Sequence, residues 1–206
     1  AWLLRVPRRF VMIEGLGEHF SYGANALRNR FTRALTLTLY RISLPKATST
    51  IFLNKDDLQF FLSKGVTSSN RSTLIDGIGI DLDYFRPEPP PKANRIEFLF
   101  IGRLIEQKGV LTFIEAAKRI LKLRSDVTFT LVGELDSNSK EITKAHLKAW
   151  VDSGVVRYAG FVEDIRPYIQ RASAVVLPSY YREGLPRSLL EGMAMGRPLI
   201  TTDTPG

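Results

Sequence analysis

Two glutamates, Glu183 and Glu191, have the residue type and spacing of a polar ligand site. Glu183 follows an apolar run that predicts a buried strand, while Glu191 falls in the first turns of a predicted helix. A carboxylate at the edge of that helix's buried face can accept hydrogen bonds from two adjacent ribose hydroxyls. Glu183 could then contact hydroxyl groups of a second sugar. The alternative is that both glutamates are ordinary surface residues, as most glutamates are. The side chains expected to form the buried face of the helix are Leu189, Leu190, Met193 and Ala194.

A second loop carries positive charges. It runs from Gly102 to Gly109 and follows another apolar run. Gly102 allows the backbone to approach a ligand closely, and Arg103 and Lys108 place two cations where the next helix begins. Helix amino termini attract phosphate, so the loop is suited to neutralise a leaving pyrophosphate, a task that a divalent metal performs in other enzymes. The alternative is a surface loop whose basic side chains are merely solvated.

The elements that must position these loops alternate strictly after residue 95. The pattern predicts strands over 96–101, 127–132, 155–158, 174–177 and 198–201, and helices over 110–123, 139–152, 164–171 and 187–195. Such alternation predicts βαβ units, hence an α/β fold with a Rossmann-like parallel sheet and helices on both faces. Ligands of open parallel sheets bind at the carboxyl ends of the strands. The loops to consider therefore begin at Gly102, Gly133, Ala159 and Pro178.

The first 86 residues predict a smaller α/β part. The expected strands are 9–13, 49–53 and 72–75, and the expected helices are 25–46 and 56–62. In the longer helix, apolar residues recur every three or four positions with arginines between them, namely Leu27, Phe31, Leu35, Leu39 and Ile42. A following stretch rich in proline predicts an extended boundary. We predict a partial amino-terminal domain over 1–86, a linker over 87–94 and a carboxyl-terminal domain over 95–206.

Positive charge is concentrated near the beginning of the chain. Residues 1–50 hold eight basic and two acidic side chains, and so contribute +6 of the formal net charge of +8. A basic face can contact anionic lipid, nucleic acid or a phosphate-bearing acceptor, or it can be solvated. The apolar runs are too short to cross a bilayer. Cysteine is absent, which excludes disulfide scaffolds and cysteine-built metal sites and fits a cytoplasmic protein.

Several motifs stand in the order found in one enzyme family. They are Gly102-Arg103, Lys108-Gly109, Val132-Gly133, Gly160-Phe161, Leu177-Pro178-Ser179 and the E-x(7)-E pair Glu183/Glu191. Together they resemble the family-4 retaining glycosyltransferases, which have GT-B architecture, and the resemblance extends from Asp76 to Gly206. It implies two Rossmann-like domains, of which the first is only partly present, and a nucleotide-sugar donor.

The resemblance also implies roles for particular residues. Arg103 and Lys108, beside Gly102, would bind the donor diphosphate, and Glu191 would bind the ribose. Glu183 would be the catalytic residue at the donor sugar. Two backbone N–H groups would assist it, those of Gly184 and Leu185. A loop that includes Phe161 and Val162 would lie beside the base. Such enzymes need no cofactor and no bound metal in this domain.

The amino-terminal part resembles members that act on undecaprenyl-diphosphate-linked sugars in surface-polysaccharide assembly. The residues that carry this weaker resemblance lie around Gly17 and His19, which it places on the acceptor side, and in 52–57. It implies a UDP-sugar donor, a lipid-linked or polysaccharide acceptor, and a cytoplasmic protein peripheral to the inner face of the plasma membrane. Residues 1–50 would contact the anionic membrane surface.

Two other functions stay open at this point. A sugar-nucleotide epimerase of the same architecture would need other acid and base residues and leaves the Glu183/Glu191 spacing unexplained. A basic nucleic-acid-binding module is a non-enzymatic alternative, but the charge lies outside the motif-bearing half, so we expect no nucleic-acid partner. A nicotinamide dehydrogenase is disfavoured because no G-x-G-x-x-G motif follows a strand. The chain begins without Met and ends just after a strand, so we interpret it as a piece that binds donor without transferring sugar.

Overall fold

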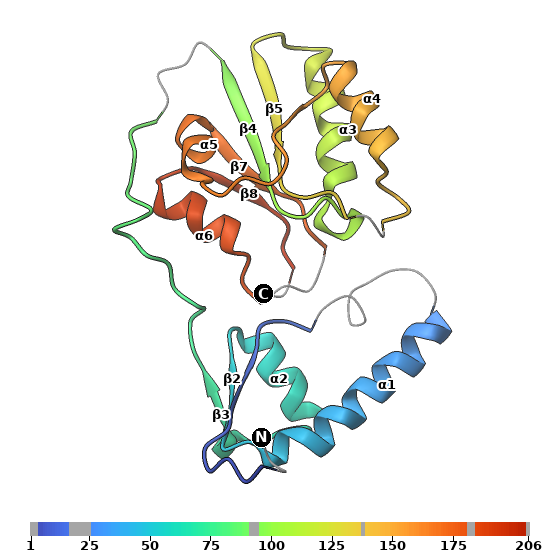
Figure 1. The fold of residues 1–206 in the computed structure, drawn as a ribbon, viewed down its shortest axis with the longest axis vertical. Helices are drawn as coiled ribbons and strands as arrows, with labels where there is room; N and C mark the ends of the chain where they lie inside the picture. The colour runs from blue at the N-terminus through green and yellow to red at the C-terminus, as the bar shows by residue number, and fades with distance from the viewer. Residues whose placement is uncertain (1–3, 17–25, 91–94, 137–138, 181–183, 205–206) are drawn as a thin grey trace. The chain divides into compact units, whose positions relative to one another are not determined.

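The computed structural model describes residues 4–16, 26–90, 95–136, 139–180 and 184–204, with residues 26–30 described by their backbone alone (Figure 1). The described residues form two compact units. The first is built mainly from residues up to 79, and the second from residues 80–180 and 187–203.

The first unit is a three-stranded parallel sheet with helical crossovers. Its strands are β1 (Phe10–Ile13), β2 (Ser49–Phe52) and β3 (Ser72–Leu74), in the order β1-β2-β3. Its helices are α1 (Ala26–Ser43) and α2 (Lys55–Ser63), with 3-10 turns at Leu44–Lys46 and Ser69–Arg71. Asn54 begins α2, because its side-chain oxygen accepts a hydrogen bond from the Asp57 N–H at 2.7 Å. The edge-to-face rings of Phe52 and Phe61 lie in the centre of the small core.

The apolar residues that recur at helical spacing along α1 are not buried in the structure. Leu37 and Tyr40 pack against the core of the first unit. The described stripe residues are exposed instead: Phe31 by 74%, Leu35 by 49%, Leu39 by 57% and Ile42 by 57%. The α-helix also ends at Ser43, before the predicted residue 46, because a 3-10 turn that contains Pro45 follows at Leu44–Lys46. The structure therefore leaves an apolar helix face in contact with solvent.

The second unit is a doubly wound, five-stranded parallel sheet. The strands are β4 (Ile96–Ile101), β5 (Val127–Val132), β6 (Arg157–Tyr158), β7 (Ala174–Leu177) and β8 (Leu199–Thr201). Their order is β6-β5-β4-β7-β8, so the chain winds outward from β4 in one direction and then returns to its other side. Strands β4, β5 and β7 have the bounds predicted from the sequence.

Helices cover both faces of this sheet, as predicted (Figure 1). The helices are α3 (Val110–Leu121), α4 (Lys144–Asp152), α5 (Arg166–Arg171) and α6 (Arg187–Ala194), with a 3-10 turn, η4, at Glu106–Lys108. Phe113 of α3 and Leu147 of α4 belong to the apolar core on one face. Ile169 of α5 and Ala194 of α6 belong to the core on the other face.

Two sequence predictions about these helices are wrong. Helix α4 begins at Lys144 instead of residue 139, because Thr143 and His146 form a reciprocal capping box at its amino terminus. Met193 of α6 was expected to face inward but is 57% exposed. Gly192 is buried in its place, and a Cβ atom there would lie 2.9 Å from a methyl carbon of Val175. The missing side chain therefore lets α6 pack closely on β7.

The segment before β4 packs onto the second unit as far as Pro89. Phe85 is buried in the same core as α5 and α6. The buried guanidinium of Arg197 donates hydrogen bonds to the carbonyl oxygens of Glu88 and Pro89, at 3.0 and 2.9 Å. Residues 91–94 of the predicted linker lie outside the described residues. The predicted domain boundaries remain predictions.

Candidate functional site

Two loops meet where the winding of the second sheet changes direction. Strands β4 and β7 are neighbours, with Phe98 opposite Ala174, although 76 positions separate these residues. The loops that follow the two strands therefore leave the sheet side by side at its carboxyl edge. Doubly wound sheets bind their ligands at such a switch point. One loop carries Arg103 and Lys108, and the other leads toward Glu183 and Glu191.

Glycines bring the strand ends close together at this edge. Gly102 has φ +155° and Gly133 has φ +140°, a region that side chains disfavour. A Cβ atom on Gly133 would lie 1.9 Å from the carbonyl oxygen of Gly102, so no other residue fits without moving the backbone. The Tyr158 hydroxyl donates to the Gly133 carbonyl oxygen at 3.1 Å, which fixes the end of β5 from its other side. The backbones of β4 and β5 therefore approach each other closely at this edge.

Lys108 lies across this edge of the sheet. A Cβ atom built on Gly102 would lie 3.3 Å from the Cδ and 3.8 Å from the Nζ of Lys108. The ammonium group is therefore held over the end of β4, one residue before the glycine at which α3 begins. A cation and the nearby amino terminus of α3 together make an environment suited to a phosphate.

Arg103 is in the same loop, but its side chain forms an ion pair with an acidic residue. Its guanidinium is 3.9 Å from a carboxylate oxygen of Asp136, and its side chain is 60% exposed. An exposed ion pair of this length contributes little stability, so the guanidinium can exchange this partner for a stronger anion. The structure thus places both predicted cations at the carboxyl edge, with Lys108 over the backbone and Arg103 beside Asp136.

Glu191 lies in the second turn of α6 and is largely buried, with its side chain 13% exposed. Burial raises the pKa of its carboxyl above the ordinary value for glutamate. The Arg187 guanidinium, 3.9 Å away, lowers that pKa in part. The carboxylate is thus poorly solvated in this structure, and the hydroxyl groups of a ligand would be favourable partners for it.

The Glu191 carboxyl should make stability depend on pH. Because its pKa is higher in the folded chain than in the unfolded chain, the group favours folding when protonated and opposes it when ionised. We expect Glu191→Gln to be more stable than the unsubstituted chain at pH 7. The difference should vanish below pH about 4, where glutamate is protonated in both states. Urea denaturation at both pH values measures it, and a variant less stable at pH 7 would contradict the burial argument.

The other predicted site residues are only partly described. Glu183, Gly17 and His19 lie outside the described residues. Gly184 and Leu185 follow directly after the undescribed positions and precede α6. Phe161 is 74% exposed after β6, whereas Val162 packs against the core between the sheet and α5 and α6. Their assignments as donor-binding or acceptor-side residues remain predictions.

The sequence interpretation missed the contacts between the two loops. Gly109 has φ +77°, and a Cβ atom there would lie 2.0 Å from the carbonyl oxygen of Pro178. The Gln107 carbonyl oxygen accepts hydrogen bonds from the Tyr180 N–H at 3.0 Å and from the Ser179 hydroxyl at 3.3 Å. No sequence signal indicates these contacts, because they depend on β4 and β7 being neighbours.

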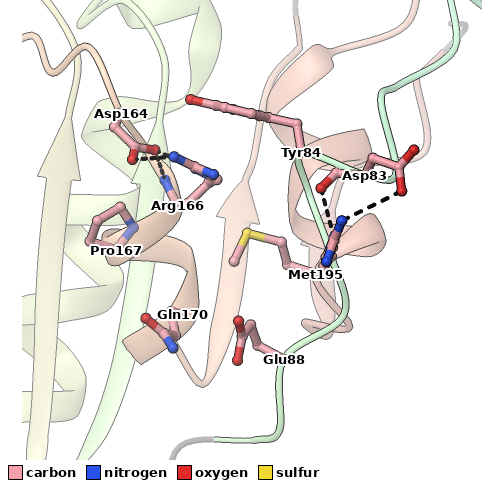
Figure 2. A pocket seen from close by; sticks show the side chains of 9 residues that line it. Asp83, Tyr84, Glu88, Asp164, Arg166, Pro167, Gln170 and Met195 are labelled. Carbon is pink, nitrogen blue, oxygen red and sulfur yellow. Dashed lines mark hydrogen bonds and ion pairs between the residues drawn. The ribbon is translucent and has the colours of Figure 1, made fainter.

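A separate cavity of about 440 Å³ lies between the segment preceding β4 and helix α5 (Figure 2). The Arg166 guanidinium lies 3.8 Å from the centre of the Tyr84 ring and is paired with Asp164 at 2.8 Å. Figure 2 shows this stack beside Pro167. None of the predicted donor-binding residues lines the cavity. We interpret the stack as a contact that holds the segment before β4 against α5.

No described helix is both long and apolar enough to span a bilayer. Among the described residues, no three or more His, Asp or Glu side chains are grouped as metal ligands would be. That the protein needs no metal and no other cofactor remains a prediction.

A doubly wound parallel sheet with a basic loop at its switch point is an architecture that many nucleotide-binding α/β proteins share. A family model described as glycosyl transferases group 1 matches residues 95–206, and the chain belongs to this family. The predicted fold class and the resemblance to glycosyltransferases of GT-B architecture are thereby confirmed.

Two curated relatives are similar over most of the chain. One is N,N'-diacetylbacillosaminyl-diphospho-undecaprenol alpha-1,3-N-acetylgalactosaminyltransferase of Campylobacter jejuni, 31% identical over 98% of this chain and 54% of that protein. The other is UDP-Gal:alpha-D-GlcNAc-diphosphoundecaprenol alpha-1,3-galactosyltransferase of Escherichia coli, 29% identical over 77% of this chain and 43% of that protein. The chain spans about half the length of these curated relatives.

A solved structure supports the fold. Anabaena Alr3699/HepE in complex with UDP has a TM-score of 0.75 and 18% identity to this chain. The match covers 97% of this chain and 54% of that one. At this identity the likeness establishes the fold and nothing further.

Proposed function

We propose that the protein is a retaining glycosyltransferase that moves a sugar from a UDP-sugar to a lipid-linked or saccharide acceptor in surface-polysaccharide synthesis. The observation that carries the proposal is the meeting of the β4 and β7 loops, with Lys108 held over Gly102. Family membership supports the reaction class. The names of the two relatives specify acceptors linked to diphospho-undecaprenol, and one names a UDP-sugar donor. No observation favours an epimerase or a nucleic-acid-binding module.

The proposed chemistry develops negative charge on the donor diphosphate. The bond between the anomeric carbon and a diphosphate oxygen breaks, and a bond to an acceptor hydroxyl oxygen forms on the same face of the sugar. The acceptor's proton leaves with the nucleoside diphosphate. Lys108 and Arg103 stabilise the developing charge, because cations that are already positioned before the reaction lower the energy of a developing anion. We propose that no bound metal is required.

The remaining site residues hold the rest of the donor. We propose that Glu191 accepts hydrogen bonds from the ribose hydroxyls, which also relieves its poor solvation. Glu183 would contact the transferred sugar, with the N–H groups of Gly184 and Leu185 beside it. The exposed ring of Phe161 would lie near the base.

A thermal-shift panel with UDP, GDP and ADP tests the proposal. The matching nucleotide at 100 times its Kd should add about 2.7 kcal/mol of stability. Stabilisation by UDP alone would establish the donor base. If none of the three stabilises the chain and duplex DNA does, the glycosyltransferase proposal fails and the nucleic-acid-binding alternative is favoured.

The Glu191 assignment predicts dependence on the ribose hydroxyls. Glu191→Ala should weaken UDP binding by about 1–3 kcal/mol and leave 2′,3′-dideoxy-UDP nearly unaffected, because only UDP presents the proposed donors. Calorimetry with both nucleotides measures the difference. Glu115→Ala, which removes an exposed carboxylate from α3, serves as the control. Equal affinities of Glu191→Ala and the unsubstituted chain for UDP would remove Glu191 from the site.

We also propose that the basic amino-terminal part contacts an anionic membrane surface, on the inner face of the plasma membrane. The exposed face of α1, with Phe31, Leu35 and Leu39, supports this proposal, as does the net charge of +6 in residues 1–50. Apolar side chains flanked by cations are typical of helices that lie in a membrane interface.

Vesicle co-sedimentation provides the test. We expect binding to vesicles containing phosphatidylserine, no binding to neutral vesicles, and release by high salt, since each basic residue near the surface contributes about 1 kcal/mol. Leu39→Glu on α1 should weaken binding, whereas Leu123→Glu, at an exposed leucine of the second unit, should not. Binding that ignores lipid charge and salt would contradict the proposal.

A further inference from the structure

The loop after β5 lies against the loop after β4, and backbone contacts hold the two loops together. The Leu104 N–H donates a hydrogen bond to the Glu134 carbonyl oxygen at 2.8 Å, and Leu104 and Leu135 form a parallel β-bridge. The Leu104 side chain is fully buried in the core of the second unit. Successive side chains of an extended chain point to opposite sides, so Arg103 and Asp136, which flank the bridge, lie on its outer side. The pairing of the loops therefore brings Arg103 and Asp136 together.

The contact between Arg103 and Asp136 is an ion pair that an anionic ligand can break. One guanidinium nitrogen of Arg103 is 3.9 Å from a carboxylate oxygen of Asp136, whereas hydrogen-bonded ion pairs are about 2.7–2.9 Å long. The Arg103 side chain is 60% exposed, and that of Asp136 is 26% exposed. Exposed pairs change an equilibrium constant by at most about fivefold. The pair thus holds the guanidinium only weakly, yet it keeps a carboxylate beside one of the two cations at this edge of the sheet.

We propose that Asp136 competes with the donor diphosphate for Arg103, and so limits how tightly the protein holds a nucleoside diphosphate. This inference rests on the proposed function, because it requires Arg103 to contact the diphosphate. The guanidinium must leave the Asp136 carboxylate to meet a phosphate oxygen, and breaking the ion pair weakens the binding. After sugar transfer, the carboxylate recovers Arg103 as UDP leaves, which accelerates release of the product. Product release limits turnover in many enzymes, so this competition can increase the rate of turnover.

Calorimetry of UDP and uridine with Asp136→Asn tests the competition. Asparagine keeps the shape of the side chain but removes its charge. We expect UDP to bind about two- to fivefold more tightly than to the unsubstituted chain, and uridine to bind equally, because only UDP carries phosphates. The gain should appear mainly as slower dissociation of UDP in stopped-flow measurements, and it should shrink in high salt.

Glu134→Gln is the matched control for Asp136→Asn. It removes an exposed carboxylate from the same loop but leaves the ion pair of Arg103 with Asp136 intact. The UDP affinity of this variant should change by less than about twofold. A gain as large as that of Asp136→Asn would show that any negative charge on the loop opposes the diphosphate, and would overturn the specific competition for Arg103.

A double-mutant cycle with Arg103 tests whether the effect acts through the guanidinium. In the Arg103→Ala background, Asp136→Asn should gain clearly less UDP affinity, because the group for which Asp136 competes is gone. Weaker UDP binding by Asp136→Asn alone would overturn the inference, since Asp136 would then position Arg103 for the ligand. Unchanged affinity, or an equal gain in the Arg103→Ala background, would also overturn it and leave the proposed function standing. A chain that binds no UDP at all would overturn the proposed function and this inference with it.

Discussion

Replacing Lys108 by alanine is expected to weaken UDP binding by about 1.5–3 kcal/mol while hardly changing uridine binding. The ammonium lies over Gly102 at the end of β4, where it can meet the diphosphate but not the nucleoside. Calorimetry of both ligands with the variant and the unsubstituted chain measures the difference. Arg103→Ala should cause a smaller loss, because the guanidinium is mostly exposed and must give up Asp136 to bind the ligand.

Lys118→Ala is the matched control for Lys108→Ala. It removes the same charge from an exposed position of α3 and should change neither affinity. The salt dependence of UDP binding should also fall in Lys108→Ala and not in Lys118→Ala, since one fewer cation faces the phosphates. If Lys108→Ala weakens UDP and uridine to the same extent, the lysine has no specific role at the diphosphate.

Replacing Gly109 by alanine is expected to destabilise the chain by about 2–5 kcal/mol. Two effects combine in this variant. Gly109 has φ +77°, which costs a residue with a side chain about 1–2 kcal/mol. The new Cβ atom would also lie 2.0 Å from the carbonyl oxygen of Pro178, so the β4 and β7 loops must separate. Because the proposed donor site lies where these loops meet, UDP binding should be lost as well.

Gly154→Ala separates the two effects. Gly154 has φ +72°, almost the same backbone conformation, but a Cβ atom there would have no neighbour within 4 Å. This variant should lose only the conformational part, about 1–2 kcal/mol, and should bind UDP normally. Urea denaturation and calorimetry of the two variants measure both quantities. Equal destabilisation by the two substitutions would show that the loops are not pressed together at Gly109.

Local sequence patterns were sufficient to predict the bounds of the strands whose side chains are mostly buried. The central strands β4, β5 and β7 have the predicted bounds, because short runs rich in apolar, aromatic and β-branched residues are typical of strands. The ends and the buried faces of helices were predicted less well, because they depend on capping interactions and on packing against other elements. The start of α4 depends on the capping box of Thr143 and His146, and the apolar stripe of α1 gave no indication of which side faces the core. In α6, the absence of a side chain at Gly192 outweighed the apolar character of Met193.

The sequence by itself determined the α/β class and the order of the elements, and it indicated the candidate site residues, whose roles remain predictions. These features depend on local periodicity, on glycines at strand ends and on motif spacing, all of which can be recognised along the chain. Only the tertiary structure decided that β4 lies beside β7, that Lys108 crosses Gly102 and that Tyr180 contacts η4. The physical reason is that strand order arises from hydrogen bonds and packing between segments more than 70 positions apart, as in the pairing of Phe98 with Ala174.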